Sequence, residues 1–166
     1  MKQQLLKKIE EKSIVVGVVG LGYVGLPLAV EKAKAGFKTI GFDVQDEKVN
    51  LVNEGHNYIG DVVDSDLKEL VENKMLTATT DFSFVKDVDF VAICVPTPLD
   101  AHQQPDISYV KSSTEAISKY LTKGTMVVLE STTYPGTTEE LIKPILGRFR
   151  IKMWRRFLFR IFTGTC

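Results

Sequence analysis

The chain has 166 residues, of which 44% are hydrophobic and 25% charged, as expected for one soluble globular domain. Six of its 21 basic residues lie in residues 147–166, so residues 1–146 carry 15 basic against 21 acidic residues, a net charge of −6. That charge disfavours nucleic-acid binding, and without an apolar run of about 18 residues a membrane-spanning helix is excluded. We therefore expect a cytoplasmic protein that binds neither nucleic acid nor a membrane.

Apolar, β-branched runs alternate with helix-forming stretches along the chain. An amphipathic helix is expected over residues 1–12, whose charges distinguish it from a signal peptide. Five runs predict buried strands, over residues 13–19, 38–43, 76–79, 87–95 and 125–130. Helices are predicted near residues 24–35, 47–53, 65–73, 108–121 and 137–146, the fourth of them capped by Asp106. This alternation predicts an α/β fold with a doubly wound parallel sheet of the Rossmann type, in the strand order 3-2-1-4-5.

The sequence Gly20-Leu-Gly22-Tyr-Val-Gly25 fits the pattern G-x-G-x-x-G and lies directly between a predicted strand and a predicted helix. Gly20 permits a tight turn, Gly22 has no Cβ to obstruct a pyrophosphate, and Gly25 lets the helix pack closely. The free N–H groups at the start of the helix favour an anion there. Tyr23, inside the loop, is expected to pack against a cofactor or a neighbouring loop.

Asp43 ends the second predicted strand, 18 residues after Gly25. A carboxylate at this position accepts hydrogen bonds from ribose hydroxyls and repels a 2′-phosphate, so the pattern favours NAD over NADP. The alternative is a structural glycine turn with an Asp that caps the next helix.

Two further loops follow the fourth and fifth predicted strands. The first contains Pro96 and Thr97, and the second contains Ser131 and Thr132. Ligands bind at the carboxyl ends of strands beside a topological switch point, so these hydroxyls are expected near the nicotinamide. The alternative is ordinary turn and cap chemistry of Ser and Thr.

The cysteines and histidines show no metal-ligand spacing. Cys94 lies inside the apolar run VDFVAICV and is predicted to be a buried core thiol. His56 and His102 lie in polar loops and are expected at the surface. We expect no metal site.

Four stretches, GLGYVGLPLAV, GFDVQDEKV, CVPTPLD and ESTTYPGTTEE, follow one another in this order. Over about residues 12–146 the chain resembles the NAD-binding domain of the nucleotide-sugar 6-dehydrogenases, the UDP-glucose/GDP-mannose dehydrogenase family. The last two stretches are most similar to the branch that oxidises UDP-N-acetylhexosamines. The resemblance implies NAD as cofactor, a UDP-sugar as substrate and a homo-oligomeric full-length protein that oxidises a sugar C6 alcohol to a carboxylate in two NAD-dependent steps.

The same resemblance implies individual roles. The loop Leu21–Val24 would hold the pyrophosphate, Asp43 would bind the adenosine ribose and Lys48 would lie beside it. Thr97 would lie near the nicotinamide ribose, and Thr132 near the reaction site as the one candidate catalytic residue. The cysteine nucleophile of the family and its lysine and asparagine partners lie farther along a much longer chain. We therefore expect this chain to lack the central and C-terminal substrate domains and to be inactive alone.

Residues 147–166, GRFRIKMWRRFLFRIFTGTC, differ from the rest in holding four Phe, one Trp and no acid. Family members continue here with a stretch similar to GEDFFLAYSPERVDPG, which contains the sixth strand. A choice of synonymous codons for residues 147–166, read from the second nucleotide, gives EDSGLKCGEDFFFAYSPERV; the single codons of Met153 and Trp154 fix its Cys-Gly pair. We therefore expect a one-nucleotide frameshift near Gly147, an aberrant tail and the loss of the sixth strand.

Two alternatives remain open from the sequence. The tail could be a basic aromatic segment for an anionic membrane or RNA. The chain as a whole could be a non-catalytic dinucleotide-binding or dimerisation module.

Overall fold

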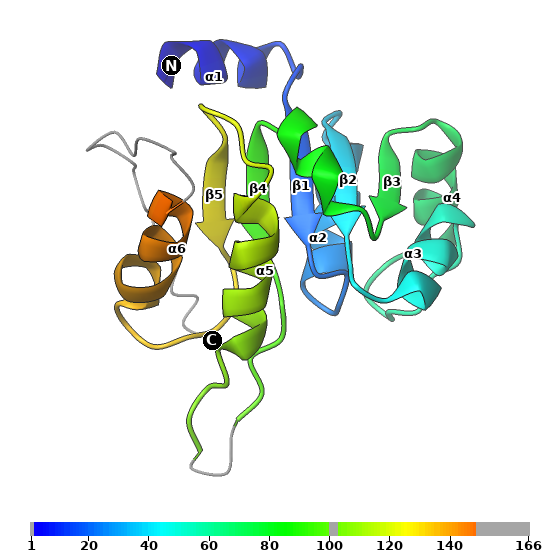
Figure 1. The fold of residues 1–166 in the computed structure, drawn as a ribbon. Helices are drawn as coiled ribbons and strands as arrows, with labels where there is room; N and C mark the ends of the chain where they lie inside the picture. Colours follow the sequence, from blue (N-terminus) through cyan, green and yellow to red (C-terminus); the bar gives the residue numbers. More distant parts are fainter. Residues whose placement is uncertain (1, 100–102, 149–166) are drawn as a thin grey trace.

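The structure, a computed structural model, describes residues 2–99 and 103–148 and contains one parallel sheet. Its five strands are β1 (Val15–Val19), β2 (Lys38–Phe42), β3 (Leu76–Thr79), β4 (Phe90–Ile93) and β5 (Met126–Leu129). Their order is β3-β2-β1-β4-β5 (Figure 1), which confirms the predicted fold class and strand order. The expected loss of a sixth strand concerns residues 149–166, which lie outside the described residues, as does His102.

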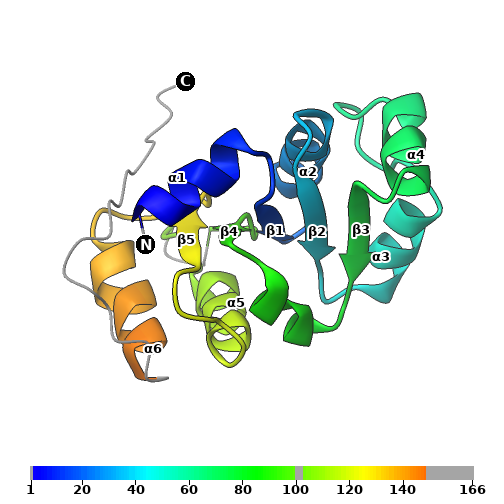
Figure 2. The same cartoon turned by 90° about the horizontal axis from the view of Figure 1, so that it is seen from above.

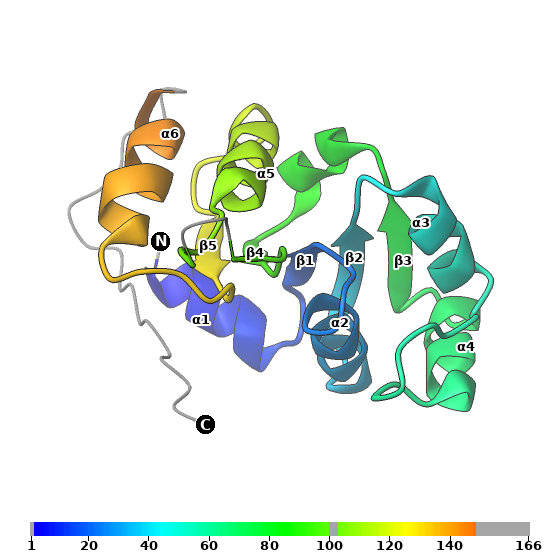
Figure 3. The same cartoon turned by 90° about the horizontal axis from the view of Figure 1, so that it is seen from below.

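Helices lie on both faces of the sheet and complete a doubly wound arrangement. The helices of the described residues are α1 (Lys2–Glu10), α2 (Gly25–Lys34), α3 (Asp46–Asn53), α4 (Asp64–Glu72), α5 (Ser108–Ser118) and α6 (Lys143–Arg148). Figures 2 and 3 show α2 and α4 on one side of the sheet and α5 and α6 on the other. None of the helices in the described ranges has the length and apolar character needed to cross a membrane.

Each central strand contributes side chains to two hydrophobic cores, because its side chains alternate between the two faces of the sheet. Val16 and Val18 of β1 join the core formed with α2, α3 and α4. Val91 and Ile93 of β4 join the core formed with α5 and α6. Burial on both faces explains why these strands are continuous apolar runs in the sequence.

Several predicted boundaries differ from the structure by two or three residues: β1 begins at Val15 rather than residue 13, and α5 ends at Ser118 rather than residue 121. Two further differences have a local physical cause. The strand expected from residue 87 begins at Phe90, because Phe82–Asp87 forms a 3-10 helix that the Asp81 carboxylate starts by accepting the Ser83 N–H. The helix expected over residues 137–146 starts as a π-helical turn, Thr138–Ile142, before α6. Pro144 cannot donate a backbone hydrogen bond to the carbonyl of Glu140, four residues earlier, and its ring would clash with that carbonyl in a regular α-helix. The wider π-helical turn relieves the clash.

Asp106 acts at the start of α5, as predicted. Its carboxylate accepts the Ser108 N–H at 2.9 Å, although Ile107 occupies the N-cap position itself. The same hydrogen bond holds the pKa of Asp106 below its ordinary value, because it favours the ionised carboxylate.

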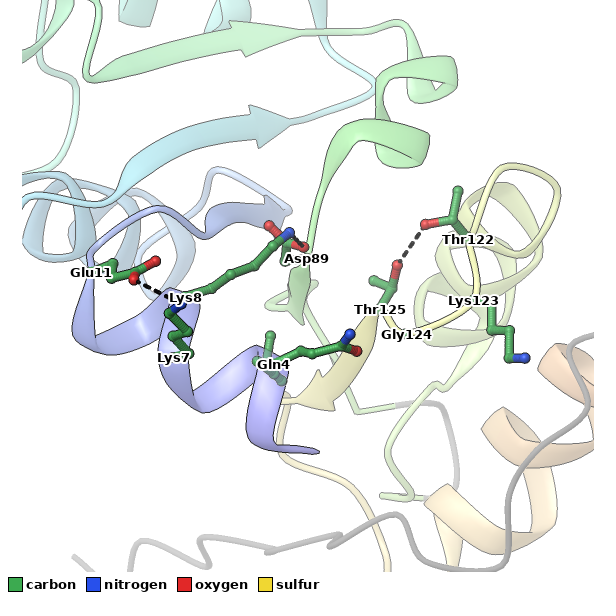
Figure 4. A pocket seen from close by; sticks show the side chains of 10 residues that line it. Gln4, Lys7, Lys8, Glu11, Asp89, Thr122, Lys123, Gly124 and Thr125 are labelled. Atoms are coloured by element: carbon green, nitrogen blue, oxygen red, sulfur yellow. Dashed lines mark hydrogen bonds and ion pairs between the residues drawn. The ribbon is translucent and has the colours of Figure 1, made fainter. Parts of the chain in front are cut away.

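Helix α1 lies across the amino-terminal ends of the central strands. Lys8 Nζ contacts Asp89 Oδ1 at 2.6 Å, and Asp89 Oδ2 accepts the Val15 N–H at 3.1 Å. A cavity of about 460 Å³ lies between α1 and the Thr122–Thr125 turn before β5. Figure 4 shows the side chains that line it. This cavity lies at the end of the sheet opposite to the glycine-rich loop.

The outer edge of β3 is closed by a side chain. Asn53, the last residue of α3, donates from Nδ2 to the Ala78 carbonyl at 2.9 Å, and its Oδ1 accepts the Ala78 N–H at 2.8 Å. The amide thus replaces a neighbouring strand and blocks pairing at this edge.

We expect Asn53→Ala to lower the free energy of unfolding by about 1 kcal/mol relative to Asn50→Ala, because two partly exposed hydrogen bonds are lost. Asn50 lies on the same helix, is exposed, and its side chain makes no hydrogen bond within residues 2–99 and 103–148. Urea unfolding followed by circular dichroism measures the difference. Equal losses in the two variants would contradict a role for the Asn53 amide.

Candidate functional site

A cavity of about 510 Å³ lies at the carboxyl ends of β1, β2 and β4. Its volume is in the range of small-molecule sites. Seven residues singled out from the sequence line it: Gly20, Gly22, Tyr23, Val24, Asp43, Lys48 and Pro96. Leu21 and Gly25 lie behind the lining, where they shape the loop from within.

The three glycines of the loop meet three different constraints. Gly20 has φ +91°, and a Cβ there would lie 2.8 Å from the carbonyl oxygen of Cys94. A Cβ on Gly25 would lie 1.7 Å from the carbonyl oxygen of Gly20, which no side chain can tolerate. A Cβ on Gly22 would meet no atom within 4 Å, so open space lies beside this residue. Gly20 and Gly25 are required by packing, whereas Gly22 faces the cavity.

The start of α2 offers unpaired donors to this open space. Its N-cap residue, Val24, makes no side-chain capping hydrogen bond. Within the described parts of the chain, the N–H groups of Gly22, Tyr23 and Val24 donate no hydrogen bond. These groups and the helix dipole create a positive potential that suits a phosphate group.

Asp43 is 7% exposed and holds the glycine-rich loop in place. Its Oδ2 accepts the Leu21 N–H at 2.8 Å, and its Oδ1 accepts the Gln45 N–H at 3.0 Å. A carboxylate oxygen can accept more than one hydrogen bond, so both oxygens retain capacity for a ligand hydroxyl. The structure thus gives Asp43 a second task, that of fixing the loop, which its position in the sequence did not indicate.

Tyr58 is a site residue that sequence reasoning missed. Its hydroxyl donates to the Leu21 carbonyl at 2.7 Å, and the residue lines the cavity. Asn57 braces this segment by donating to the carbonyls of Ile59 and Val62 and accepting the Ile59 N–H. Burial raises the pKa of Tyr58 well above its ordinary value, and the Asp43 carboxylate adds to the shift.

One wall of the cavity comes from residues that no motif marks. Phe82 follows β3, and three residues of α5 face the same space: Tyr109, Ser112 and Ser113. Their spacing on α5 fits one helix face, but an ordinary amphipathic helix shows the same spacing. Only the packing of α5 beside β4 brings them to the loop.

The hydroxyl residues after β4 and β5 do not line the cavity. Ser131 Oγ donates to the Val95 carbonyl at 2.7 Å and so joins the two loops. Thr97 is partly exposed and Thr132 is exposed. The Ser131 hydrogen bond joins residues 36 positions apart, so it is not the local turn or cap chemistry of the alternative. Thr97 and Thr132 lie at the same end of the sheet as the cavity but outside its walls.

Cys94 is buried at the end of β4 and also lines the cavity. Burial raises the pKa of its thiol to about 12, and the nearby Glu130 carboxylate adds to the effect. At neutral pH the thiol is therefore protonated and a poor nucleophile. This agrees with the prediction of a core thiol.

Comparisons with known proteins agree on one family. The profile of the UDP-glucose/GDP-mannose dehydrogenase family, NAD binding domain, matches residues 14–160. The chain is 41% identical over 138 residues to the UDP-N-acetyl-D-glucosamine 6-dehydrogenase of Pseudomonas aeruginosa, covering 83% of this chain and 32% of that protein.

Solved structures of related dehydrogenases have the same fold. The NDP-N-acetyl-D-galactosaminuronic acid dehydrogenase of Methanosarcina mazei superposes with a TM-score of 0.76 at 33% identity, covering 87% of this chain and 33% of that one. A ternary complex of the GDP-mannose dehydrogenase of Pseudomonas aeruginosa gives a TM-score of 0.74 at 30% identity, covering 81% and 32%.

The chain thus spans about a third of the length of the relatives it matches. The profile match ends at residue 160, beyond the resemblance over residues 12–146 that the sequence motifs indicated. The end of the profile match therefore does not coincide with the change to a basic, aromatic composition at Gly147.

The glycine contacts predict opposite outcomes for two substitutions in one loop. Gly25→Ala should lower the free energy of unfolding by at least about 3 kcal/mol, since its Cβ collides with backbone. Gly22→Ala should change it by less than about 1 kcal/mol, since its Cβ enters open space. Urea unfolding of both variants checks this, and similar losses would show that the loop packs differently.

Proposed function

The chain belongs to the UDP-glucose/GDP-mannose dehydrogenase family, and we propose that the cavity beside Gly22 holds the NAD on which this family depends. The observation that carries the proposal is the open space beside Gly22, next to N–H groups that have no partner among the described residues and to a helix N-terminus without a side-chain cap. A pyrophosphate needs such a place, where a Cβ would obstruct it and where donors are free. The residues present therefore fit the cofactor.

The proposed contacts form two groups, one at the adenosine end of the cofactor and one at its nicotinamide end. The loop Leu21–Val24 binds the pyrophosphate, Asp43 accepts hydrogen bonds from the adenosine ribose, and Lys48 lies beside that ribose. Thr97 and Thr132 lie toward the nicotinamide, with Thr132 nearest the reaction site. Support for the first three roles comes from the cavity lining, whereas Thr97 and Thr132 rest on the family resemblance alone.

When bound, NAD accepts a hydride from the substrate. The chain's own residues hold and orient it, and the buried Asp43 carboxylate keeps the loop in shape while it does so. We propose that the full-length protein is a homo-oligomer that oxidises the C6 alcohol of a UDP-sugar to the uronic acid. A UDP-N-acetylhexosamine is the proposed sugar, because relatives with this activity in their names share 41% and 34% of their aligned residues with the chain.

We also propose that residues 147–166 are the product of a one-nucleotide frameshift. The support is the reading EDSGLKCGEDFFFAYSPERV in the neighbouring frame. The described residues contain the cavity proposed for the cofactor but no ionised thiol, since Cys94 is protonated at neutral pH. The covalent step of the proposed oxidation needs an activated nucleophile, so this chain alone should not complete it.

NAD should bind at least about tenfold more tightly than NADP, equivalent to 1.4 kcal/mol, because the Asp43 carboxylate repels a 2′-phosphate. Isothermal calorimetry with both cofactors tests this. The ratio of NADP to NAD dissociation constants should fall in Asp43→Asn. It should not change in Asp46→Asn, which removes an exposed charge nearby. Equal affinities in the unaltered chain would remove Asp43 from this role.

The frameshift proposal is tested on the gene and on its product. Sequencing should show an open frame that continues past the codon for Cys166 once one nucleotide near the Gly147 codon is removed. The chain expressed without that nucleotide should form NADH with UDP-sugars, while the chain as given should bind NAD without turnover. Turnover by the present chain, or a corrected frame that soon stops, would overturn the proposal.

A further inference from the structure

Two side chains fix the two peptide groups on either side of Leu21. Asp43 accepts the Leu21 N–H, which belongs to the Gly20–Leu21 peptide. Tyr58 donates to the Leu21 carbonyl, which belongs to the Leu21–Gly22 peptide. Each peptide group is planar, so one hydrogen bond to it restricts the direction of both its polar atoms.

The carbonyl of Leu21 and the N–H of Gly22 share one peptide plane and point in opposite directions. Tyr58 holds the carbonyl on its own side, so the Gly22 N–H points away from Tyr58. That N–H has no partner among the described residues, and Gly22 lines the cavity with no atom within 4 Å of where its Cβ would be. The hydroxyl of Tyr58 therefore sets the direction of a donor at the proposed pyrophosphate position.

The neighbourhood of Leu21 makes this arrangement stiff. The Leu21 side chain is fully buried against Gly41 of β2, where a Cβ would lie 2.7 Å from a Leu21 methyl carbon. The Asn57 amide fixes the turn that carries Tyr58 through three hydrogen bonds. Because the pKa of Tyr58 is raised well above its ordinary value, its hydroxyl remains a donor at every pH used for a binding measurement.

We propose that Tyr58 is a positioning residue for the pyrophosphate, acting through the Leu21–Gly22 peptide rather than by touching the cofactor's phosphates. The inference rests on the proposed function, since it presumes that the cavity binds NAD. A donor already aimed at its acceptor costs less ordering on binding than one that must first turn. Tyr58 thereby pre-organises the loop that the three glycines make possible.

The test compares Tyr58→Phe with Tyr120→Phe, which removes a hydroxyl that makes no hydrogen bond within the described ranges and lies outside the cavity. Calorimetry at 10 °C measures binding of NAD and ADP-ribose. A nuclear magnetic resonance titration measures binding of adenosine, which has no phosphate. Loss of one hydrogen bond should weaken NAD and ADP-ribose by about three- to tenfold. Adenosine should bind both variants as it binds the unaltered chain.

A second measurement does not depend on stability. In ¹⁵N spectra without ligand, the Gly22 amide resonance should shift and broaden in Tyr58→Phe and stay unchanged in Tyr120→Phe. Unaltered NAD affinity in Tyr58→Phe would overturn the inference, as would an equal loss for adenosine, which would indicate a general loosening of the cavity. Failure of the unaltered chain to bind NAD would instead overturn the proposed function.

Discussion

The contact between the Gly20 carbonyl and Gly25 constrains the whole site. The carbonyl oxygen lies where a Cβ of Gly25 would be, so the first turn of α2 rests directly on the turn that leaves β1. Beneath that turn, Gly20 packs against the Cys94 backbone at the end of β4. The loop is thus confined between a strand end and a helix start. This confinement brings the helix N-terminus to the cavity, where its dipole favours an anion.

Within this confined loop, neighbouring residues serve opposite purposes. Leu21 turns inward and fills the space that Gly41 leaves in β2, so the loop is anchored by the same burial that forms the core. Gly22 turns outward to the cavity. Burying the Asp43 charge is costly unless it is hydrogen-bonded, and the N–H groups of Leu21 and Gln45 supply those bonds. The core and the site are therefore one structure, and a change at Leu21 or Asp43 would affect both.

The two ends of the sheet differ in what covers them. At the amino-terminal end, Lys8 and Asp89 tie α1 to the backbone of Val15, so this end is covered. At the carboxyl end, the chain leaves the paired strands β1 and β4 toward opposite faces of the sheet, and the cavity lies between the loops that follow them. Parallel strands place all their carboxyl ends on one side, so the loops that carry the proposed cofactor contacts meet there.

The sequence by itself predicted the strand order, the tight turn at Gly20, the close packing at Gly25 and the position of Asp43 at the end of β2. These follow from patterns within short segments: apolar runs that need two covered faces, and a turn that only glycine can make. Tertiary structure alone decided that Tyr58 and the α5 residues Tyr109, Ser112 and Ser113 face the cavity. They arrive from segments far along the chain, and a polar loop or an amphipathic helix looks the same in sequence wherever it packs. The tertiary structure also decided that Ser131 does not line the cavity. Its hydroxyl donates to the Val95 carbonyl because of how the two loops meet in space, which the sequence does not show.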